Sequence, residues 1–236
     1  MKNRYIFDVD GTLTPSRGKI DPEFKEFFLE FIKTHKVWLV TGSDYPKTLE
    51  QLGPEICEGV VTCYNCSGND VFHRGKRVNS KGFEPPKELY DLLNGWLQGS
   101  SFPLRMGYHI EERRGTINFS IIGRPTDPEL TVAERNLYIQ HDTANRERES
   151  IALEINLNFP DVTATVGGET GIDIYRKGGD KSQILEDFGE ENEKIYFFGD
   201  RMQPSGNDYP LAYANPKGVN IEVKDWRDTW SRLREL

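Results

Sequence analysis

Short apolar segments alternate with helical segments towards both ends of the 236-residue sequence. Four of these segments are apolar along most of their length, which is typical of strands buried on both faces of a sheet; they lie at residues 6–9, 37–42, 59–65 and 194–200. Strands that alternate with helices along a chain pair in parallel and are joined by right-handed crossovers. The sequence therefore predicts an α/β fold built on a parallel sheet.

Two helices are predicted between the first three strands. The first lies at residues 21–33, where four phenylalanines recur at helical spacing: Phe24, Phe27, Phe28 and Phe31. Asp21 is a suitable N-cap for this helix, and Ser43 or Asp44 can cap the second, over residues 45–52. These signals give the first third of the chain a strand–helix–strand–helix–strand order.

The pattern changes in the middle of the sequence. A helix is expected at residues 87–97, antiparallel strands at 108–123 around a turn at Arg114–Gly115, one long polar helix or two at 129–155, and strands again at 162–178. The α/β pattern then resumes. We therefore expect an α/β core of residues 1–78 and 181–236, interrupted by an inserted α+β unit of residues 79–180.

The composition narrows the range of functions. A formal net charge of −8 weighs against a general nucleic-acid-binding protein, because such proteins usually present a basic face. No segment approaches the roughly 20 apolar residues that a membrane span requires, so no membrane association is expected. The first strand begins within a few residues of the N-terminus, leaving no room for a signal peptide, so a cytoplasmic location is expected.

Cys63 and Cys66 form a single C-x-x-C motif in "VTCYNCSG". A zinc site would need two further ligands, and the four histidines are scattered along the sequence. A redox motif usually opens a helix, whereas this one leads into the turn-forming sequence "SGND". A metal or redox role stays open, but reduced thiols near a strand end are the favoured interpretation.

Acidic and hydroxyl side chains lie at or just after the ends of three of the predicted strands. They are Asp8 and Asp10, Thr41 and Ser43, and Asp200 with Asp208 shortly after it. Because parallel strands bring their carboxyl ends to one edge of the sheet, we expect these side chains to converge there. Any single aspartate at a strand end can be a turn former, but a cluster of carboxylates is tolerated when it holds a cation, and such oxygen ligands suit Mg²⁺.

Three motifs resemble those of the haloacid dehalogenase (HAD) phosphotransferases: "FDVDGTLT", the lysine of "GGDKSQIL" and "FFGDRMQPSGND". Further segments extend the similarity over nearly the whole chain, in the right order: "TGSDYPKTLEQLG", "INFSIIGR", "ERESI" and "GGETGIDIYRKGGDK". On these residues the chain resembles the eukaryotic-type phosphomannomutases. The resemblance implies a HAD-like core with a parallel sheet and an inserted α+β cap with an antiparallel sheet.

The resemblance also implies a mechanism through an aspartyl phosphate. Asp8 would be the nucleophile, and Asp10 the general acid and base. Lys181 and the hydroxyl of Thr41 or Ser43 would neutralise the transferring oxygens. Mg²⁺ would be held by the carboxylates of Asp8 and Asp200 and by the backbone carbonyl of Asp10. Asp208 is a further expected member of this metal site.

A mutase must also bind the second phosphate of a bisphosphate, and arginines suit that task better than lysines. The positions that match the family's cap arginines are Arg113, Arg124 and Arg135, together with Arg17 in the core. Asp173 matches an acid that contacts sugar hydroxyls, and Asn118 is a weaker candidate nearby. For Arg146 and Arg148 we favour the alternative that they lie on a solvated face or pair with acids.

Three features depart from the family pattern. Gly171 stands where the family has a serine, which removes one hydroxyl donor to the distal phosphate and would cost about 1 kcal/mol of binding. Four additional residues lie between Arg124 and Arg135. Asn215 replaces an acid that binds a second cation in the family, so no second metal is expected.

The function that the resemblance implies is interconversion of mannose 6-phosphate and mannose 1-phosphate, primed by a hexose 1,6-bisphosphate. A sugar-phosphate phosphatase would share every core residue and differ only in discharging the aspartyl phosphate to water. A non-catalytic sugar-phosphate-binding protein is the third possibility. The expected partners are a hexose phosphate and, since the resembling enzymes dimerise through their caps, a second copy of the chain.

Overall fold

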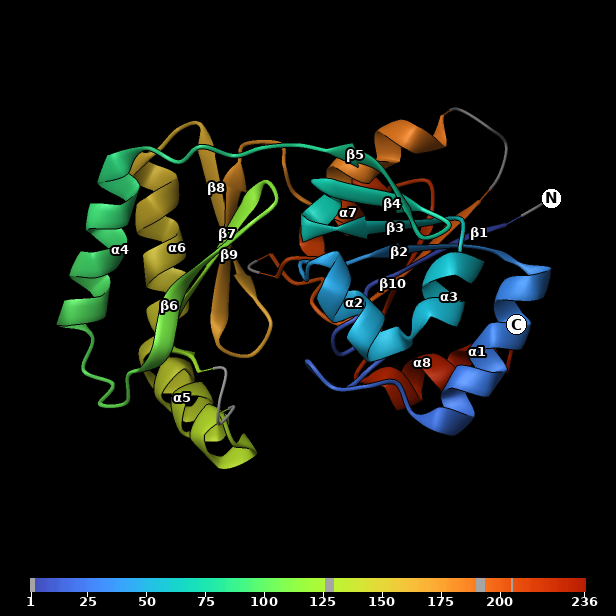
Figure 1. Cartoon of the computed structure of the whole chain (residues 1–236), viewed down its shortest axis with the longest axis horizontal. Coiled ribbons are helices and arrows are strands. Elements are labelled where there is room, and N and C mark those ends of the chain that lie inside the picture. Colours follow the sequence, from blue (N-terminus) through green and yellow to red (C-terminus); the bar gives the residue numbers. More distant parts are fainter. Residues whose placement is uncertain (1–2, 126–129, 190–193, 205) are drawn as a thin grey trace. The chain divides into compact units, whose positions relative to one another are not determined.

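Two units, each with its own hydrophobic core, make up the computed structural model, which describes residues 3–125, 130–189, 194–204 and 206–236 (Figure 1). One unit, the core, comprises Met1–Lys81 and Gly179–Leu236; the other, the cap, comprises Gly82–Gly178. The expected boundary after residue 78 is wrong by a few residues. It would cut through strand β5 (Lys76–Ser80), whose backbone pairs with the core sheet.

The core contains a seven-stranded sheet in the order β11-β10-β1-β2-β3-β4-β5. Its remaining strands are β1 (Arg4–Phe7), β2 (Lys36–Val40), β3 (Thr62–Asn65), β4 (Asp70–His73), β10 (Ile195–Gly199) and β11 (Val219–Glu222). The strands from β11 to β3 are parallel, which confirms the predicted α/β sheet. The antiparallel hairpin β4–β5, which extends the sheet beyond β3, was not predicted.

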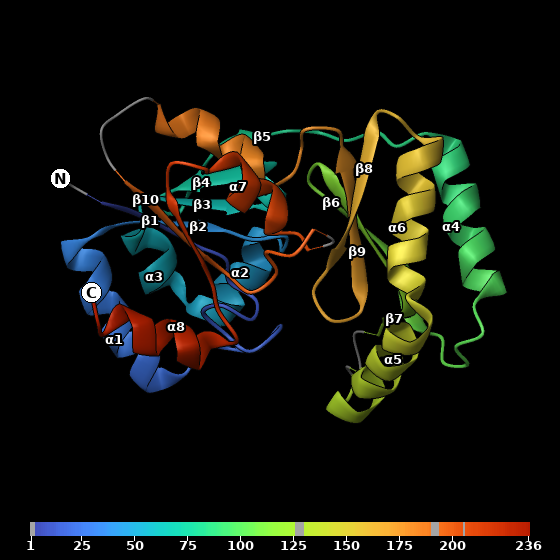
Figure 2. The same cartoon turned by 180° about the vertical axis from the view of Figure 1, so that it is seen from behind.

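Helices cover both faces of the core sheet, as Figures 1 and 2 show from opposite sides. One face packs against α1 (Pro22–Thr34), α2 (Tyr45–Leu52), α3 (Pro54–Gly59) and α8 (Trp226–Leu233). The other packs against the 3₁₀ helix η2 (Lys181–Phe188) and α7 (Tyr209–Ala214), while the short 3₁₀ helix η1 (Cys66–Gly68) joins β3 to β4. In β1, Tyr5 and Phe7 pack on one face of the sheet and Ile6 on the other, so these three successive residues are all large and hydrophobic.

The predicted starts of α1 and α2 are confirmed. The carboxylate of Asp21 accepts hydrogen bonds from the backbone N–H groups of Glu23 and Phe24, and α1 begins at Pro22. Of the two candidate caps for α2, Asp44 is the one used, since its side chain accepts from the N–H of Lys47 at 3.0 Å. These caps fix where each helix begins, and therefore which residues follow each strand.

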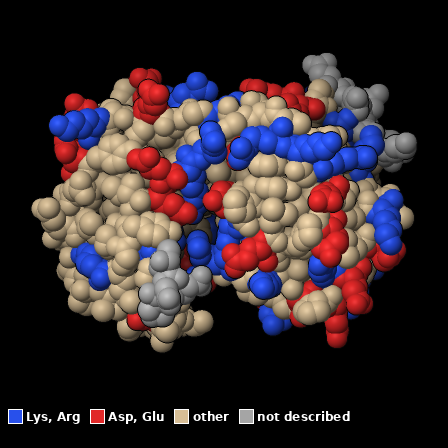
Figure 3. All heavy atoms as spheres, viewed as in Figure 1, with Lys and Arg blue, Asp and Glu red and all other residues tan. Residues whose placement is uncertain are grey.

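The β4–β5 hairpin forms one edge of the core sheet and carries basic side chains, which Figure 3 shows gathered over this part of the surface. His73, Arg74, Lys76 and Arg77 are all exposed. The guanidinium of Arg77 is held by the buried carboxylate of Asp70 at 2.8 Å. Charged residues on an exposed edge strand disfavour pairing with another chain, so this strand is protected against aggregation.

The cap contains a four-stranded antiparallel sheet in the order β6-β7-β9-β8, as predicted for the insert. Its strands are β6 (Met106–Arg113), β7 (Thr116–Arg124), β8 (Val162–Gly167) and β9 (Gly171–Arg176), and its helices are α4 (Lys87–Gly99), α5 (Val132–Asn145) and α6 (Glu147–Asn158). All three helices pack on one face of this sheet. The predicted turn at Arg114–Gly115 is confirmed.

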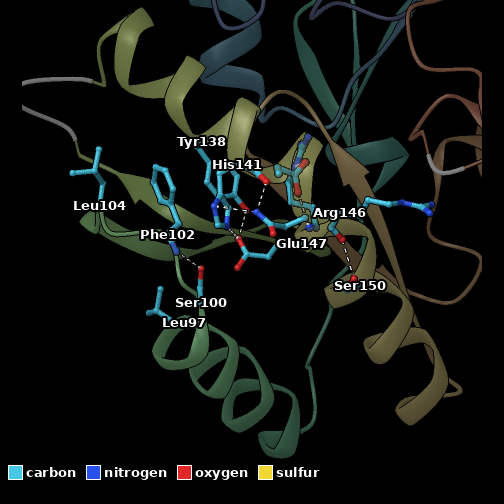
Figure 4. Close-up of polar contacts among 12 residues, drawn as sticks. Leu97, Ser100, Phe102, Leu104, Tyr138, His141, Arg146, Glu147 and Ser150 are labelled. Atoms are coloured by element: carbon cyan, nitrogen blue, oxygen red, sulfur yellow. Dashed lines mark hydrogen bonds and ion pairs between the residues drawn. The ribbon is translucent and has the colours of Figure 1, made fainter.

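The polar segment after β7 forms two helices rather than one; its predicted start at residue 129 lies outside the described residues. Arg146, with φ of 51°, ends α5 and redirects the chain. Figure 4 shows the junction, where Tyr138 donates to Glu147 and His141 lies close to the same carboxylate. Arg146 binds Glu149 on the surface, whereas Arg148 forms a buried pair with Asp142, so both arginines pair with acids, as favoured.

Alternation along the cap strands separates an apolar face from a polar one. Ile117, Phe119 and Ile121 of β7 belong to the cap core under the helices. The intervening residues of β7 and of its neighbours therefore point to the opposite face of the sheet. That face carries Asn118 and Asp173, two of the residues that the sequence singles out as candidate substrate ligands.

Candidate active site

The catalytic candidates of the core meet at the carboxyl ends of three neighbouring parallel strands. Asp8 follows β1, Thr41 follows β2 and Asp200 follows β10. The N–H of Asp8 donates to the carbonyl of Phe198 at 2.9 Å, which continues the sheet pairing up to the candidate nucleophile. Parallel pairing thus places these side chains at one edge, where open α/β sheets bind their ligands.

A cluster of three carboxylates surrounds one lysine at this edge. One oxygen from each of Asp8, Asp200 and Asp208 lies within 4.8 Å of the others. The ammonium of Lys181 donates to Asp8 at 2.6 Å and to Asp208 at 2.7 Å, and the lysine side chain is completely buried. Lys181, at the first position of η2, is therefore fixed between the candidate nucleophile and a second acid.

The electrostatics of this cluster fit a bound cation. Burial raises the pKa of Asp8 well above its usual value, and Asp208 and Asp200 raise it further. Burial and the neighbouring Asp208 raise the pKa of Asp200 to about 7. Burial alone would lower the pKa of Lys181, but Asp208 and Asp8 raise it. Three carboxylates sharing one ammonium leave excess negative charge, which a divalent cation with a preference for oxygen ligands would offset.

Gly11 allows the loop after β1 to approach this cluster. Its φ is 83°, and a Cβ at this position would lie 2.5 Å from Oδ2 of Asp200. No other residue type fits without moving that carboxylate. The glycine of the "FDVDGTLT" motif is thus required by the close approach to Asp200.

The carboxylate of Asp10 is held apart from the three-acid cluster by donors of its own. Its Oδ1 accepts from the backbone N–H of Arg17 at 2.5 Å and from Nε2 of Gln51 at 2.9 Å. Its Oδ2 accepts from the hydroxyl of Ser43 at 3.1 Å. The predicted metal contact of Asp10 was through its backbone carbonyl, so the side chain remains available for proton transfer.

The two hydroxyl candidates have different surroundings. Ser43 donates its hydroxyl to Asp10, while the hydroxyl oxygen of Thr41 accepts from the backbone N–H of Ser43 at 3.0 Å. Thr41 can therefore direct its own proton elsewhere. Thr41 is therefore the better candidate for donating a hydrogen bond to a phosphate oxygen. Ser43 instead donates to Asp10, the candidate acid–base residue.

In the cap, candidate ligands line up across neighbouring strands. Glu111 of β6 pairs with Asn118 of β7, and Asn118 pairs with Asp173 of β9, so the three side chains share one face of the sheet. The amide of Asn118 donates to Asp173 at 2.6 Å, and its oxygen accepts from Arg124. Asn118 is thus engaged with both the candidate sugar ligand and a candidate phosphate ligand.

Glu111 brings two of the predicted arginines together. Its carboxylate lies 2.5 Å from Arg113 and 3.5 Å from Arg124. The third cap arginine, Arg135 of α5, lies 3.8 Å from Glu169 in the turn between β8 and β9. Sequence reasoning missed Glu111, although its position two residues before Arg113 in a strand would have placed both on one face.

Gly171 begins β9 at the point where the cap candidates meet. A Cβ there would lie 2.7 Å from Nη2 of Arg124 and 2.9 Å from both amide atoms of Asn118. The guanidinium thus occupies space that a side chain at residue 171 would need. From the sequence, only the loss of a hydroxyl group at residue 171 could be inferred. The close approach of Arg124 and Asn118 to this glycine could not.

The remaining sequence features contribute little to the site. The thiols of Cys57, Cys63 and Cys66 are buried. A hydrogen bond with Cys57, together with burial, raises the pKa of Cys63, so no reactive thiolate is favoured there. Asn215, where a second cation was not expected, donates to Asn220 at 3.0 Å. Within the described part of the chain, no helix has both the length and the apolar character needed to cross a membrane.

Comparison with solved structures identifies the fold. A trehalose-6-phosphate phosphatase related protein matches with a TM-score of 0.60 at 15% identity, over 99% of this chain and 96% of that one. An IMP-nucleotidase of Plasmodium falciparum matches with a TM-score of 0.66 at 16% identity, over 99% of this chain and 67% of that one. These likenesses confirm the HAD-type α/β core with an inserted α+β cap.

Comparison of sequences is more specific. The chain is 32% identical to a phosphomannomutase of Drosophila melanogaster over 98% of its length and 94% of the relative's, and 33% identical to one of Arabidopsis thaliana over 98% and 95%. The family model for eukaryotic phosphomannomutase matches residues 24–236. The chain belongs to the eukaryotic phosphomannomutase family.

Proposed function

We propose that the protein interconverts mannose 6-phosphate and mannose 1-phosphate through a phosphorylated Asp8, with a hexose 1,6-bisphosphate as the priming phosphate donor. The observation that carries this proposal is the buried contact of Asp8 with Lys181 inside a cluster of acids, in a member of this family. A nucleophilic carboxylate needs a fixed cationic neighbour to accept an anionic phosphoryl group.

The chemistry has two half-reactions. An oxygen of Asp8 attacks a phosphorus of the bisphosphate, the bond from phosphorus to the sugar oxygen breaks, and that oxygen takes a proton from Asp10. In the second half-reaction Asp10 takes the proton of a sugar hydroxyl, whose oxygen attacks the aspartyl phosphate and releases the Asp8 carboxylate. Lys181 neutralises charge on the transferring group throughout.

The acid cluster supplies the groups that would hold Mg²⁺. Asp8, Asp200 and the backbone carbonyl of Asp10 are the proposed ligands, with Asp208 engaged by Lys181 beside them. When bound, Mg²⁺ would lower the electrostatic repulsion between the carboxylate nucleophile and the phosphate. Because burial raises the pKa of Asp8, a cation here also favours its ionised form.

The cap arginines are the proposed ligands of the phosphate that is not being transferred. Arg113 and Arg124 share Glu111, and Arg135 lies near Glu169, so each guanidinium is oriented by an acid. Arg17, whose backbone holds Asp10, is the proposed fourth ligand. Asp173, fixed by Asn118, would accept hydrogen bonds from sugar hydroxyls.

One assay separates the candidate functions. Purified protein receives mannose 1-phosphate and Mg²⁺, with and without a trace of glucose 1,6-bisphosphate. Formation of mannose 6-phosphate that depends on the bisphosphate supports the mutase. Release of inorganic phosphate without isomerisation supports a sugar-phosphate phosphatase, the second candidate, which the missing hydroxyl at Gly171 favours. No turnover of either kind would indicate a sugar-phosphate-binding protein.

The Asp8→Asn variant tests the nucleophile directly. We expect it to lose all measurable mutase and phosphatase activity, because an amide cannot form the acyl phosphate. Asp21→Asn is the matched control, since asparagine is also a good N-cap and α1 should be preserved. A variant at residue 8 that kept most of its activity would show that another group is the nucleophile.

A further inference from the structure

Gln51, which no sequence motif singles out, contacts the candidate acid–base residue Asp10. It lies near the C-terminal end of α2 and is 2% exposed. Its Nε2 donates to Oδ1 of Asp10 at 2.9 Å, to Oγ1 of Thr14 at 3.1 Å and to the carbonyl of Gly18 at 3.3 Å. The glutamine thus reaches three points of the loop that follows β1.

The orientation of this amide is determined by its surroundings. A carboxylate oxygen and a carbonyl oxygen can only accept hydrogen bonds, so the nitrogen of Gln51, and not its oxygen, must face them. The backbone adds a further restraint, because the carbonyl of Gln51 accepts from the N–H of Ile20 at 2.9 Å. Since Asp44 caps α2, the glutamine is presented by a helix whose start is also fixed.

The donors around Asp10 make its two oxygens unequal. Oδ1 receives two hydrogen bonds, from Gln51 and from the backbone of Arg17, whereas Oδ2 receives one, from Ser43. An oxygen with two donors is the poorer site for a proton, because binding a proton there requires at least one of these hydrogen bonds to break.

We propose that Gln51 is a positioning residue for Asp10, which fixes the carboxylate so that Oδ2 is the oxygen that gives and takes the proton. In the first half-reaction the proton leaves Oδ2 for the sugar oxygen as its bond to phosphorus breaks. In the second, Oδ2 receives the proton of the attacking hydroxyl. This inference rests on the proposed function of Asp10 as general acid and base.

The test uses two phosphate donors that differ in their need for an acid. A sugar alkoxide is a poor leaving group and needs a proton, whereas p-nitrophenolate leaves without one. With enzyme in excess and Mg²⁺ present, rapid quenching gives the rate of glucose phosphate formation from glucose 1,6-bisphosphate. Release of p-nitrophenolate from p-nitrophenyl phosphate gives the corresponding rate for the second donor. Both rates report the phosphorylation of Asp8 alone.

We expect Gln51→Met to slow the reaction with the bisphosphate by about tenfold or more and the reaction with p-nitrophenyl phosphate by less than about threefold. Gln51→Asn, whose shorter side chain withdraws the amide, should shift the ratio of the two rates in the same direction. Asp10→Asn should shift it further. The ratio does not depend on how much of each variant is folded.

Thr48→Val is the matched control, because Thr48 lies on the same helix, is also buried and also loses hydrogen bonds, one to the carbonyl of Asp44 and one from the amide of Asn65, without contacting Asp10. Its ratio should equal that of the wild type. An unchanged ratio in both Gln51 variants would overturn the inference. A wild-type enzyme that is not phosphorylated by the bisphosphate would instead contradict the proposed function.

Discussion

Gly171 limits what the distal end of the proposed substrate site can accommodate. A serine there would restore the hydroxyl that the resembling enzymes have, but its Cβ would meet Arg124 and Asn118 at less than 3 Å. Arg124 can shift its flexible end, whereas Asn118 is held by Asp173 at 2.6 Å. The arrangement of these three side chains therefore depends on a glycine.

We expect Gly171→Ser to raise KM for mannose 1-phosphate about tenfold, because overpacking displaces both Asn118 and Arg124 at a cost of about 1–3 kcal/mol. The activity towards p-nitrophenyl phosphate should change little, because its one phosphate is transferred to Asp8 and none is left to bind the cap arginines. Steady-state kinetics with both substrates measure the effect. A lower KM for the sugar phosphate would show that the side chains rearrange and that the new hydroxyl contributes to binding.

Site residues that belong to recognisable motifs could be predicted from the sequence. Residues that act only by contacting them in the folded protein could not. Asp8, Asp200, Asp208 and Lys181 come together as expected, because strand ends converge and the motifs are specific. Gln51 gave no signal, since a glutamine on a helix is usually solvated and only the tertiary structure brings it to Asp10. The space taken by Arg124 beside Gly171 is equally a property of packing.

Among the elements, α2 links a helix cap to the site, because Asp44 fixes its first turn and Gln51 lies near its end. Replacing Asp44 by alanine removes the acceptor for the N–H of Lys47 and should lower the free energy of unfolding by about 1 kcal/mol. Denaturant unfolding measures this change. Asp44→Asn, which keeps a capping oxygen, should stay close to the wild type, and an equal loss in both variants would contradict the capping role.

Elements with a clear periodicity were predicted, and those decided by pairing were not. The helical spacing of the phenylalanines predicts α1, and the alternation of apolar and polar residues predicts β6 and β7. The segment 70–80 lacks such a pattern, since β5 is exposed along its whole length, and only its hydrogen bonds to β4 define it as part of the core sheet. The domain boundary predicted at residue 78 was misplaced for this reason.

At the scale of the whole molecule, the acid cluster should make the core respond to pH and cations. Burial raises the pKa of Asp200 from 3.8 to about 7, so between these values the folded protein keeps a proton that the unfolded chain has lost. Stability of the cation-free protein should therefore fall as the pH rises through this window. A bound divalent cation should offset the loss, most strongly above pH 7.

We expect Mg²⁺ to raise the melting temperature by about 2–4 °C at pH 8 and by less at pH 5.5. Differential scanning calorimetry in EDTA and in Mg²⁺ measures this difference. Because the hydrophobic clusters of the core and the cap share no residues, only the core transition should move. In the Asp200→Asn variant, the increase in melting temperature caused by Mg²⁺ should no longer differ between pH 8 and pH 5.5. If the difference persisted, the cation would bind elsewhere.

We also propose that the protein is a homodimer through its cap, as the resemblance implies. Leu153 and Leu157 lie one turn apart on α6 and are 60% and 74% exposed, so they form an apolar pair on the surface of the cap. Leu157→Glu should convert the dimer to a monomer, as measured by light scattering after size-exclusion chromatography. Lys87→Glu, a charge change on α4, is the control. A wild-type monomer at micromolar concentration would contradict the proposal.

The position of β1 in the middle of the core sheet has a consequence for biosynthesis. β1 is paired on one side with β2, which leaves the ribosome soon after it, but on the other side with β10, which follows the entire cap. A nascent chain must therefore carry an apolar strand with one unpaired edge until the last fifth of the protein has been translated. We therefore expect the chain to depend on chaperones during translation, and truncated products that lack β10 to aggregate.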